Sequence, residues 1–165
     1  MRRLDRTCSP ALRAEDGLSI VKGHCVTGRL DMSLGNDVQE VARVIDSLEE
    51  FGASEGIAPE QALRFGLVLD ELITNIISHG LKHRSDGTIQ LAIEHADGKL
   101  CAELVDDGPP FDPLATETVP PEGDIEHRQI GGLGLTLVKR FMDRLDYRRV
   151  DGFNRLNMEM KLKAA

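Results

Sequence analysis

The chain has 165 residues with a formal net charge of -8, and 41% of its residues are hydrophobic. This length supports one domain with its own core, and no apolar run reaches membrane-spanning or secretory-signal length, so we expect a cytoplasmic protein without a membrane partner. The acidic balance argues against direct nucleic-acid binding, and three widely spaced cysteines fit a reducing compartment better than a zinc or redox site.

The first part of the chain divides into a tail and the start of a folded domain. Residues 1–24 show no sustained hydrophobic period and indicate an N-terminal tail or arm. Residues 25–165 are therefore predicted to form the domain. Its first element is a strand from Cys25 to Leu34, because apolar residues alternate toward the end of that segment.

Two helices are predicted next. The first is capped by Asn36 or Asp37 and ends near Gly52, with apolar residues along one face. The second begins at Pro59, a residue that suits the first turn of a helix, and runs to Gly80. Its apolar residues wrap most of the circumference and predict a largely buried helix. They are Leu63, Leu67, Leu69, Leu72, Ile73, Ile76 and Ile77.

Two β-hairpins are predicted from Asp-Gly turns between alternating apolar segments. Residues 88–94 pair with 100–105 across Asp97-Gly98, and residues 145–150 pair with 155–162 across Asp151-Gly152.

The segment between the hairpins contains a loop and a third helix. Residues 112–130 contain several prolines and acids and little periodicity, which is typical of a mobile, lid-like loop. Residues 133–142 have helical apolar spacing. From Thr136 onward there are 8 Lys or Arg against 4 Asp or Glu. This basic excess favours a solvated face, with a patch for an acidic partner protein as the alternative.

Glu71 and Asn75 are the first pair that suggests chemistry. They lie four residues apart on the second helix and therefore share one face, about one turn apart. A carboxylate and an amide among apolar residues are costly to bury unless a polar group meets them. A ligand shared by the two side chains is one interpretation, and a solvent-facing polar stripe is the other.

Two glycine-containing turns follow. Asp106 and Gly108 stand where an alternating strand ends, so the carboxylate could accept a hydrogen bond from the amine of a base while glycine lets the ring approach closely. Residues 131–134 (GGLG) directly precede a helix, whose N-terminal N–H groups favour phosphate. An ordinary turn and a helix hinge are the alternatives, and the lysine of a P-loop is missing.

Order and spacing make these pieces specific as a set. A helical E-x-x-x-N, a D-x-G after a strand, a lid-like loop and a G-x-G before a helix together resemble the GHKL ATPases. The segments DELITNIISHG from Asp70, DDGPPFDP from Asp106 and GGLGL from Gly131 are further similar to anti-sigma-factor serine/threonine kinases of the RsbW type. The resemblance spans residues 30–162.

The resemblance implies a role for each matching residue. Glu71 would be the general base that polarises the attacking hydroxyl, and Asn75 would hold the Mg²⁺ that bridges the phosphates of ATP. Asp106 would bind the adenine amino group, with Gly108 beside the ring. The phosphates would contact the start of the third helix at Gly132, Leu133 and Gly134.

Two positions depart from the pattern that this resemblance implies. Asn157 stands on the last strand where relatives often have a Thr that supports the adenine-binding aspartate, and either side chain can form that hydrogen bond. Pro110 replaces the second glycine of D-x-G-x-G. We expect nucleotide binding to tolerate this change, whereas closure of the loop over the phosphates, and with it the kinase rate, depends on it.

The family also implies a fold and a function. The fold is the Bergerat ATP-binding fold, a two-layer α/β sandwich with a mixed, mostly antiparallel sheet covered on one face by three helices. The function is that of a partner-switching kinase, which sequesters a sigma factor or equivalent target and phosphorylates a Ser or Thr of an anti-anti-sigma (STAS-type) antagonist. A homodimer is the oligomeric state that relatives suggest. The alternative is an ATP-binding module that switches partners by docking without kinase activity.

Overall fold

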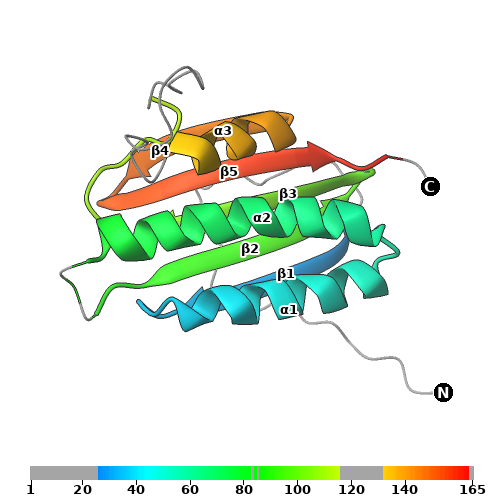
Figure 1. Ribbon diagram of the computed structural model, residues 1–165, viewed down its shortest axis with the longest axis horizontal. Helices are drawn as coiled ribbons and strands as arrows, with labels where there is room; N and C mark the ends of the chain where they lie inside the picture. The colour runs from blue at the N-terminus through cyan, green and yellow to red at the C-terminus, as the bar shows by residue number, and fades with distance from the viewer. Residues whose placement is uncertain (1–25, 83, 85, 116–131, 164–165) are drawn as a thin grey trace, which may run out of the picture.

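The chain forms two layers, with a sheet behind and helices in front (Figure 1). The computed structural model describes residues 26–82, 84, 86–115 and 132–163, so the predicted tail and most of the lid-like loop lie outside the described residues. The predicted two-layer sandwich is confirmed. The elements are β1 (Val26–Leu34), α1 (Gln39–Ser54), α2 (Pro59–Asn75), the π-helix η2 (Ile76–Gly80), β2 (Ile89–Ala96), β3 (Lys99–Asp106), α3 (Gly132–Phe141), β4 (Arg144–Val150) and β5 (Phe153–Lys161).

The strands form one sheet in the order β1-β2-β3-β5-β4. All four described pairings are antiparallel, so the parallel component of the predicted mixed sheet is not found among the described strands. Both predicted Asp-Gly hairpin turns are present. Asp97 and Gly98 have φ values of 48° and 69°, and Asp151 and Gly152 have 50° and 87°. Positive φ at both central residues is the geometry that matches the twist of paired strands.

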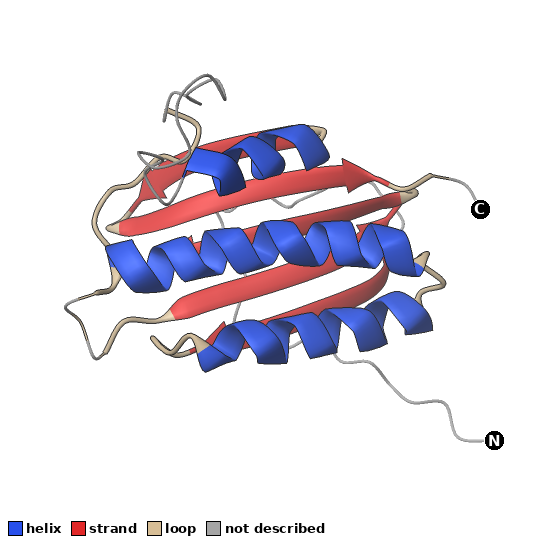
Figure 2. Cartoon of the chain, in the orientation of Figure 1, coloured by secondary structure: helices blue, strands red, loops and turns tan. Residues whose placement is uncertain are grey.

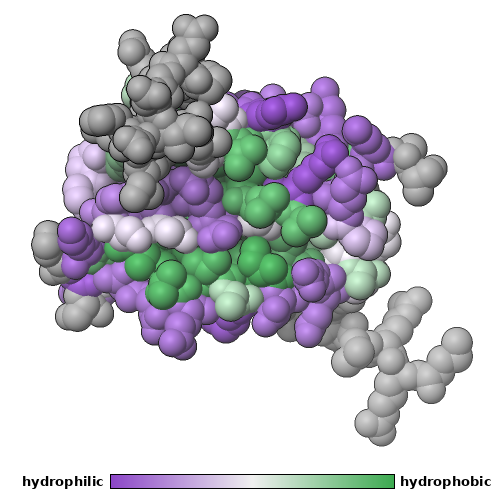
Figure 3. All heavy atoms as spheres, in the orientation of Figure 1, coloured by the Kyte–Doolittle hydropathy of each residue, from purple (hydrophilic) through white to green (hydrophobic). Residues whose placement is uncertain are grey.

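The three α-helices lie over one face of the sheet (Figure 2), and the core lies between the two layers. Phe65, Leu69 and Ile73 of α2 have no exposed surface. The prediction that α2 is buried around most of its circumference is wrong at two positions, because Leu63 and Leu67 are 58% and 45% exposed. No described element covers the outer side of the helical layer, where apolar side chains are visible between polar ones (Figure 3).

The predicted second helix reaches Gly80, but its last turn changes type. The α-helix ends at Asn75 and a π-helical turn, Ile76–Gly80, completes it. The backbone N–H of Leu81 donates to the carbonyl of Ile76 at 2.7 Å, which closes the wider ring. A Cβ atom placed on Gly108 would lie 3.4 Å from the carbonyl oxygen of Gly80. The π-helical turn thus brings the end of the helix against the turn that follows β3, and such turns are frequent at functional sites.

The helix-free face of the sheet carries ion pairs that cross between strands. Burial raises the pKa of Cys101 on this face to about 11, which keeps the thiol protonated and weakly reactive at neutral pH. The cross-strand pairs are Arg29 with Glu94, Arg155 with Glu103 at 3.0 Å and Lys99 with Glu159 at 3.2 Å.

Within the described ranges, no helix has both the length and the apolar character needed to cross a bilayer.

Candidate functional site

The predicted pair on α2 shares one face, as its spacing requires. Asn75 Nδ2 donates a hydrogen bond of 2.9 Å to Glu71 Oε1, and both residues are partly exposed. The contact uses the amide nitrogen and leaves the amide oxygen of Asn75 available to a ligand. The pair is therefore neither buried without partners nor a stripe of separate side chains.

The first turn of α3 lies directly against the carboxylate of Glu71. A Cβ atom on Gly134 would be 1.7 Å from Glu71 Cδ and 2.0 Å from Glu71 Oε1, so only glycine allows this approach. Gly132 and Leu133 precede Gly134 in the same helix. Because the first N–H groups of a helix have no intrahelical acceptor, this turn combines free donors with a partial positive charge. An anion next to Glu71 would meet those donors.

Asp106 ends β3 as a buried carboxylate with only 5% of its surface exposed. Its Oδ1 accepts two hydrogen bonds of 2.9 Å, from the backbone N–H of Gly108 and from Asn154 Nδ2. Burial raises the pKa of Asp106, and the neighbouring Asp107 adds to that effect, whereas the two hydrogen bonds and the charge of Arg149 oppose it. Among the described residues, no hydrogen bond reaches Oδ2, so that oxygen can accept one from a ligand.

The side chain that supports Asp106 is Asn154, which corrects the assignment of this role to Asn157. In the β3–β5 register Asp106 is opposite Asn154, whereas Asn157 is opposite Glu103. Alternate residues of a strand face opposite sides of the sheet, so an odd separation of three places Asn157 on the helix-free face. Asn157 therefore takes no part in this site.

Arg84 fixes the turn that follows β3. Its Nη1 donates to the backbone carbonyl of Asp107 and its Nη2 to Asp107 Oδ2, both at 2.7 Å. The backbone N–H of Thr88 donates to the other carboxylate oxygen of Asp107 at 3.2 Å. The two adjacent acids thus have separate roles, with Asp107 anchoring the turn and Asp106 facing the interior. Arg84 belongs to none of the sequence motifs, so its role is visible only in the structure.

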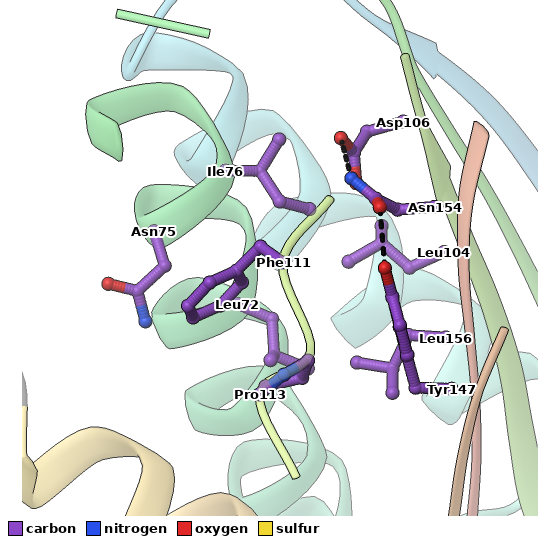
Figure 4. A pocket seen from close by; sticks show the side chains of 10 residues that line it. All are labelled: Leu72, Asn75, Ile76, Leu104, Asp106, Phe111, Pro113, Tyr147, Asn154 and Leu156. Carbon is purple, nitrogen blue, oxygen red and sulfur yellow. Dashed lines mark hydrogen bonds between the residues drawn. The ribbon is translucent and has the colours of Figure 1, made fainter. Parts of the chain in front are cut away.

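A pocket opens between α2 and the ends of β3, β4 and β5 (Figure 4). About 340 Å³ of empty space, part of it open to solvent, lies between these elements. Aliphatic and aromatic side chains form most of its wall, with Asp106 and Asn154 at one end and Asn75 at the edge. The lining residues are Leu72, Asn75, Ile76, Leu104, Asp106, Phe111, Pro113, Tyr147, Asn154 and Leu156.

The donor set beside this pocket fits one kind of metal site. The part of the chain that the structure describes contains no group of three or more His, Cys, Asp or Glu able to hold a metal ion. Mg²⁺ does not need such a group, because it keeps several waters and binds one or two protein oxygens together with substrate phosphates. The amide oxygen of Asn75, one helical turn from Glu71, fits that requirement.

Comparison with known proteins identifies related sequences. A family model described as a histidine kinase-like ATPase domain matches residues 34–160. The serine/threonine-protein kinase BtrW of Bordetella bronchiseptica is 34% identical over 98 residues, which cover 58% of this chain and 69% of that protein. An anti-sigma F factor of Clostridium botulinum is 30% identical, over 47% of this chain and 54% of its own length.

Two further relatives carry the RsbW name. The serine-protein kinase RsbW of Listeria innocua is 34% identical over 102 residues, which cover 59% of this chain and 64% of that protein. The crystal structure of the RsbU and RsbW domains of Rv1364c from Mycobacterium tuberculosis superposes with a TM-score of 0.62 at 18% identity, over 84% of this chain and 34% of that one. At that identity the superposition supports the fold alone.

Proposed function

The chain belongs to the histidine kinase-like ATPase domain family, and on that premise we propose that it is a Mg-ATP-dependent serine/threonine protein kinase of a partner-switching system. One observation carries the proposal. The carboxylate of Glu71 lies between the amide of Asn75 and the first turn of α3, next to a pocket that contains a buried Asp106. This arrangement offers a base, a metal ligand, phosphate donors and an adenine acceptor together.

Residues of three elements would hold the nucleotide. Oδ2 of Asp106 would accept a hydrogen bond from the exocyclic amine of adenine, and Gly108 would lie beside the ring. Backbone N–H groups at the start of α3, from Gly132 to Gly134, would bind phosphate oxygens. Asn75 would hold Mg²⁺ through its amide oxygen, since its nitrogen already donates to Glu71.

The transfer step depends on position and charge. Bound Mg-ATP supplies the γ-phosphoryl group and the cation that neutralises its charge. Glu71 would accept the proton of a serine or threonine hydroxyl on the protein substrate as that oxygen attacks. Asn75 fixes the orientation of the Glu71 carboxylate by hydrogen bonding, and alignment of the base with the nucleophile is the main contribution of the protein.

The protein partners follow from the relatives rather than from a surface of this chain. An anti-sigma F factor and RsbW-named kinases are among the matches, so the proposed substrate is a STAS-type antagonist and the proposed sequestered target a sigma factor or its equivalent. The alignments cover 54% of that anti-sigma F factor and 64% of the RsbW kinase of Listeria innocua. A homodimer of the free protein belongs to the same proposal.

Replacing Asp106 with asparagine tests the adenine assignment. The N–H of Gly108 and the amide of Asn154 both require an acceptor, so the new amide would keep its oxygen toward them and direct its NH₂ at the base. Loss of a hydrogen bond to a charged group predicts about 10- to 100-fold weaker ATP binding. Inosine triphosphate has a carbonyl in place of the amine, so its affinity relative to that of ATP should be higher in Asp106→Asn than in the wild type.

Calorimetric titration of the wild type and Asp106→Asn with Mg-ATP and Mg-ITP measures this change. Asp46→Asn is the control, because Asp46 is an exposed acid on α1 outside the pocket. Equal affinity of the wild type for the two nucleotides, unaltered in Asp106→Asn, would exclude the adenine role.

The raised pKa of Asp106 predicts a pH dependence of ATP affinity. The carboxylate of Asp106 accepts the hydrogen bond from the adenine amine better than the protonated carboxyl group does. ATP binding therefore favours deprotonated Asp106 and releases a proton. Affinity should therefore be full above the raised pKa and should fall as the pH drops through it, at a pH above the ordinary value of about 3.9 for Asp. Titrations at stepwise pH, with Asp106→Asn as the baseline for titration of ATP itself, isolate this dependence. If the difference in ATP affinity between the wild type and Asp106→Asn did not change with pH, titration of Asp106 would not control ATP binding.

A further inference from the structure

The carboxylate of Asp106 is the end of a hydrogen-bonded network that reaches the edge strand β4. We call it the Asn154 network, and its members are Asp106, Asn154, Tyr147 and Arg149. Asn154 Nδ2 donates to Asp106 Oδ1 and to the carbonyl of Pro109, both at 2.9 Å. Asn154 Oδ1 accepts from the Tyr147 hydroxyl at 2.8 Å and from Arg149 Nη1 at 2.7 Å. Figure 4 shows the link from Tyr147 through Asn154 to Asp106.

The two donors from β4 determine which way the amide of Asn154 faces. An asparagine amide has one accepting and one donating end, and a rotation of χ2 exchanges them. Two donors on one side require the oxygen there, so the NH₂ must face Asp106 and the carbonyl of Pro109. Asn154 is only 6% exposed, and a reversed amide would place its oxygen against the carboxylate.

Arg149 also connects the network to the glycine turn. Its Nη1 donates to the carbonyl of Gly108 at 2.7 Å as well as to Asn154. The backbone N–H of the same Gly108 donates to Asp106 Oδ1. The guanidinium of Arg149 therefore contacts both Gly108 and Asn154, the two residues whose N–H groups donate to Asp106 Oδ1. Because Oδ1 already accepts these two hydrogen bonds, Oδ2 is the oxygen that remains for a ligand.

We propose that Tyr147 and Arg149 are positioning residues that set the base selectivity of the site by orienting Asn154, so that Asp106 presents Oδ2 to a purine with an exocyclic amine. This inference rests on the proposed function, because it needs a purine nucleotide in the pocket. Neither residue needs to touch the amine. The chemical class recognised is a 6-aminopurine nucleotide, and a purine nucleotide without that amine gains nothing from the network.

Comparing two nucleotides separates this role from a general structural one. The probes are Mg-ATP and the Mg complex of purine riboside 5′-triphosphate, which lacks only the amine. The measured quantity is the ratio of the analogue Kd to the ATP Kd. Tyr147→Phe removes one hydroxyl and keeps the ring, and Arg149→Met removes the guanidinium. Both variants remove a hydrogen bond to Asn154, and this loss predicts that each variant lowers the ratio about fivefold, through weaker ATP binding at unaltered analogue binding.

Arg148→Met is the matched control. Arg148 neighbours Arg149 on β4, but its guanidinium pairs with Asp146 at 2.8 Å and has no contact with the network. Its ratio should equal that of the wild type. An unaltered ratio in both Tyr147→Phe and Arg149→Met, or equal losses for both nucleotides, would overturn the inference.

The outcomes also separate this inference from the proposed function. A wild type that binds neither nucleotide, or both equally, contradicts the proposed adenine site itself. A wild type that prefers ATP, with variants that keep the same preference, contradicts only the role of Tyr147 and Arg149. Should Arg149→Met fail to fold, Tyr147→Phe decides the question, because a hydroxyl deletion leaves the packing of the ring in place.

Discussion

Replacing Glu71 with glutamine is expected to slow phosphoryl transfer by about 10²- to 10⁴-fold, the usual contribution of a positioned general base. The variant keeps the side-chain volume and an oxygen that can accept the 2.9 Å hydrogen bond from Asn75. It removes only the capacity to take the hydroxyl proton. Single-turnover transfer from labelled Mg-ATP to the antagonist measures the rate, and calorimetry should show that ATP binding is retained.

The neighbouring acid provides the control for this variant. Asp70 is exposed on α2 and accepts a hydrogen bond from Thr74 at 3.1 Å. Asp70→Asn removes the same charge one residue away and should transfer phosphate at the wild-type rate. Transfer that survives in Glu71→Gln would assign the base to another group. Equal losses in both variants would indicate an effect of helix charge rather than proton transfer.

Gly134→Ala is expected to cost about 10²-fold in transfer rate, the size of effect that a displacement of about 1 Å can produce. The added methyl would overlap the carboxylate of Glu71, at 1.7 Å from its Cδ. The carboxylate is the end of a flexible side chain and can move aside, whereas the backbone of α3 cannot. Alanine is favoured over glycine within a helix by about 0.5–1 kcal/mol, so the free energy of unfolding should not fall.

Urea unfolding and the transfer assay together identify the cause of any loss. Gly35→Ala is the control, because a Cβ there meets its nearest atom, Oε1 of Glu40, at an ordinary 3.7 Å. It should be active and folded. A Gly134→Ala protein with wild-type activity would show that the position of the Glu71 carboxylate is not critical. A marked loss of stability would instead place the defect in packing.

Local patterns predicted most of the elements but not all contacts between them. Alternation and the two Asp-Gly turns located both hairpins, because hairpin pairing is local in the sequence. The pairing of β3 with β5 joins segments that are separated by residues 107–152, so local spacing does not specify its register. The resemblance points to Asn157 as the supporting residue, whereas the observed register places Asn154 opposite Asp106.

The helical layer shows a second limit of sequence patterns. Apolar spacing around α2 predicts that Leu63 and Leu67 are buried, but no described element covers the outer side of the helical layer, and both side chains are exposed. The pattern equally gave no sign of the π-helical turn at Ile76–Gly80, since its sequence suits an α-helix as well. Glu71 and Asn75 were paired correctly because a separation of four residues fixes their relative direction on any helix.

Phosphate transfer, as opposed to nucleotide binding alone, leaves a covalent product on the protein substrate. The most direct measurement is the intact mass of a STAS-type antagonist after incubation with the wild-type chain and Mg-ATP, with Glu71→Gln in parallel. We expect the addition of one phosphate, mapped to a serine or threonine, with the wild type and almost none with the variant. An antagonist that binds the ATP-loaded wild-type protein but gains no phosphate would rule out the proposed kinase activity and favour a docking switch without kinase activity.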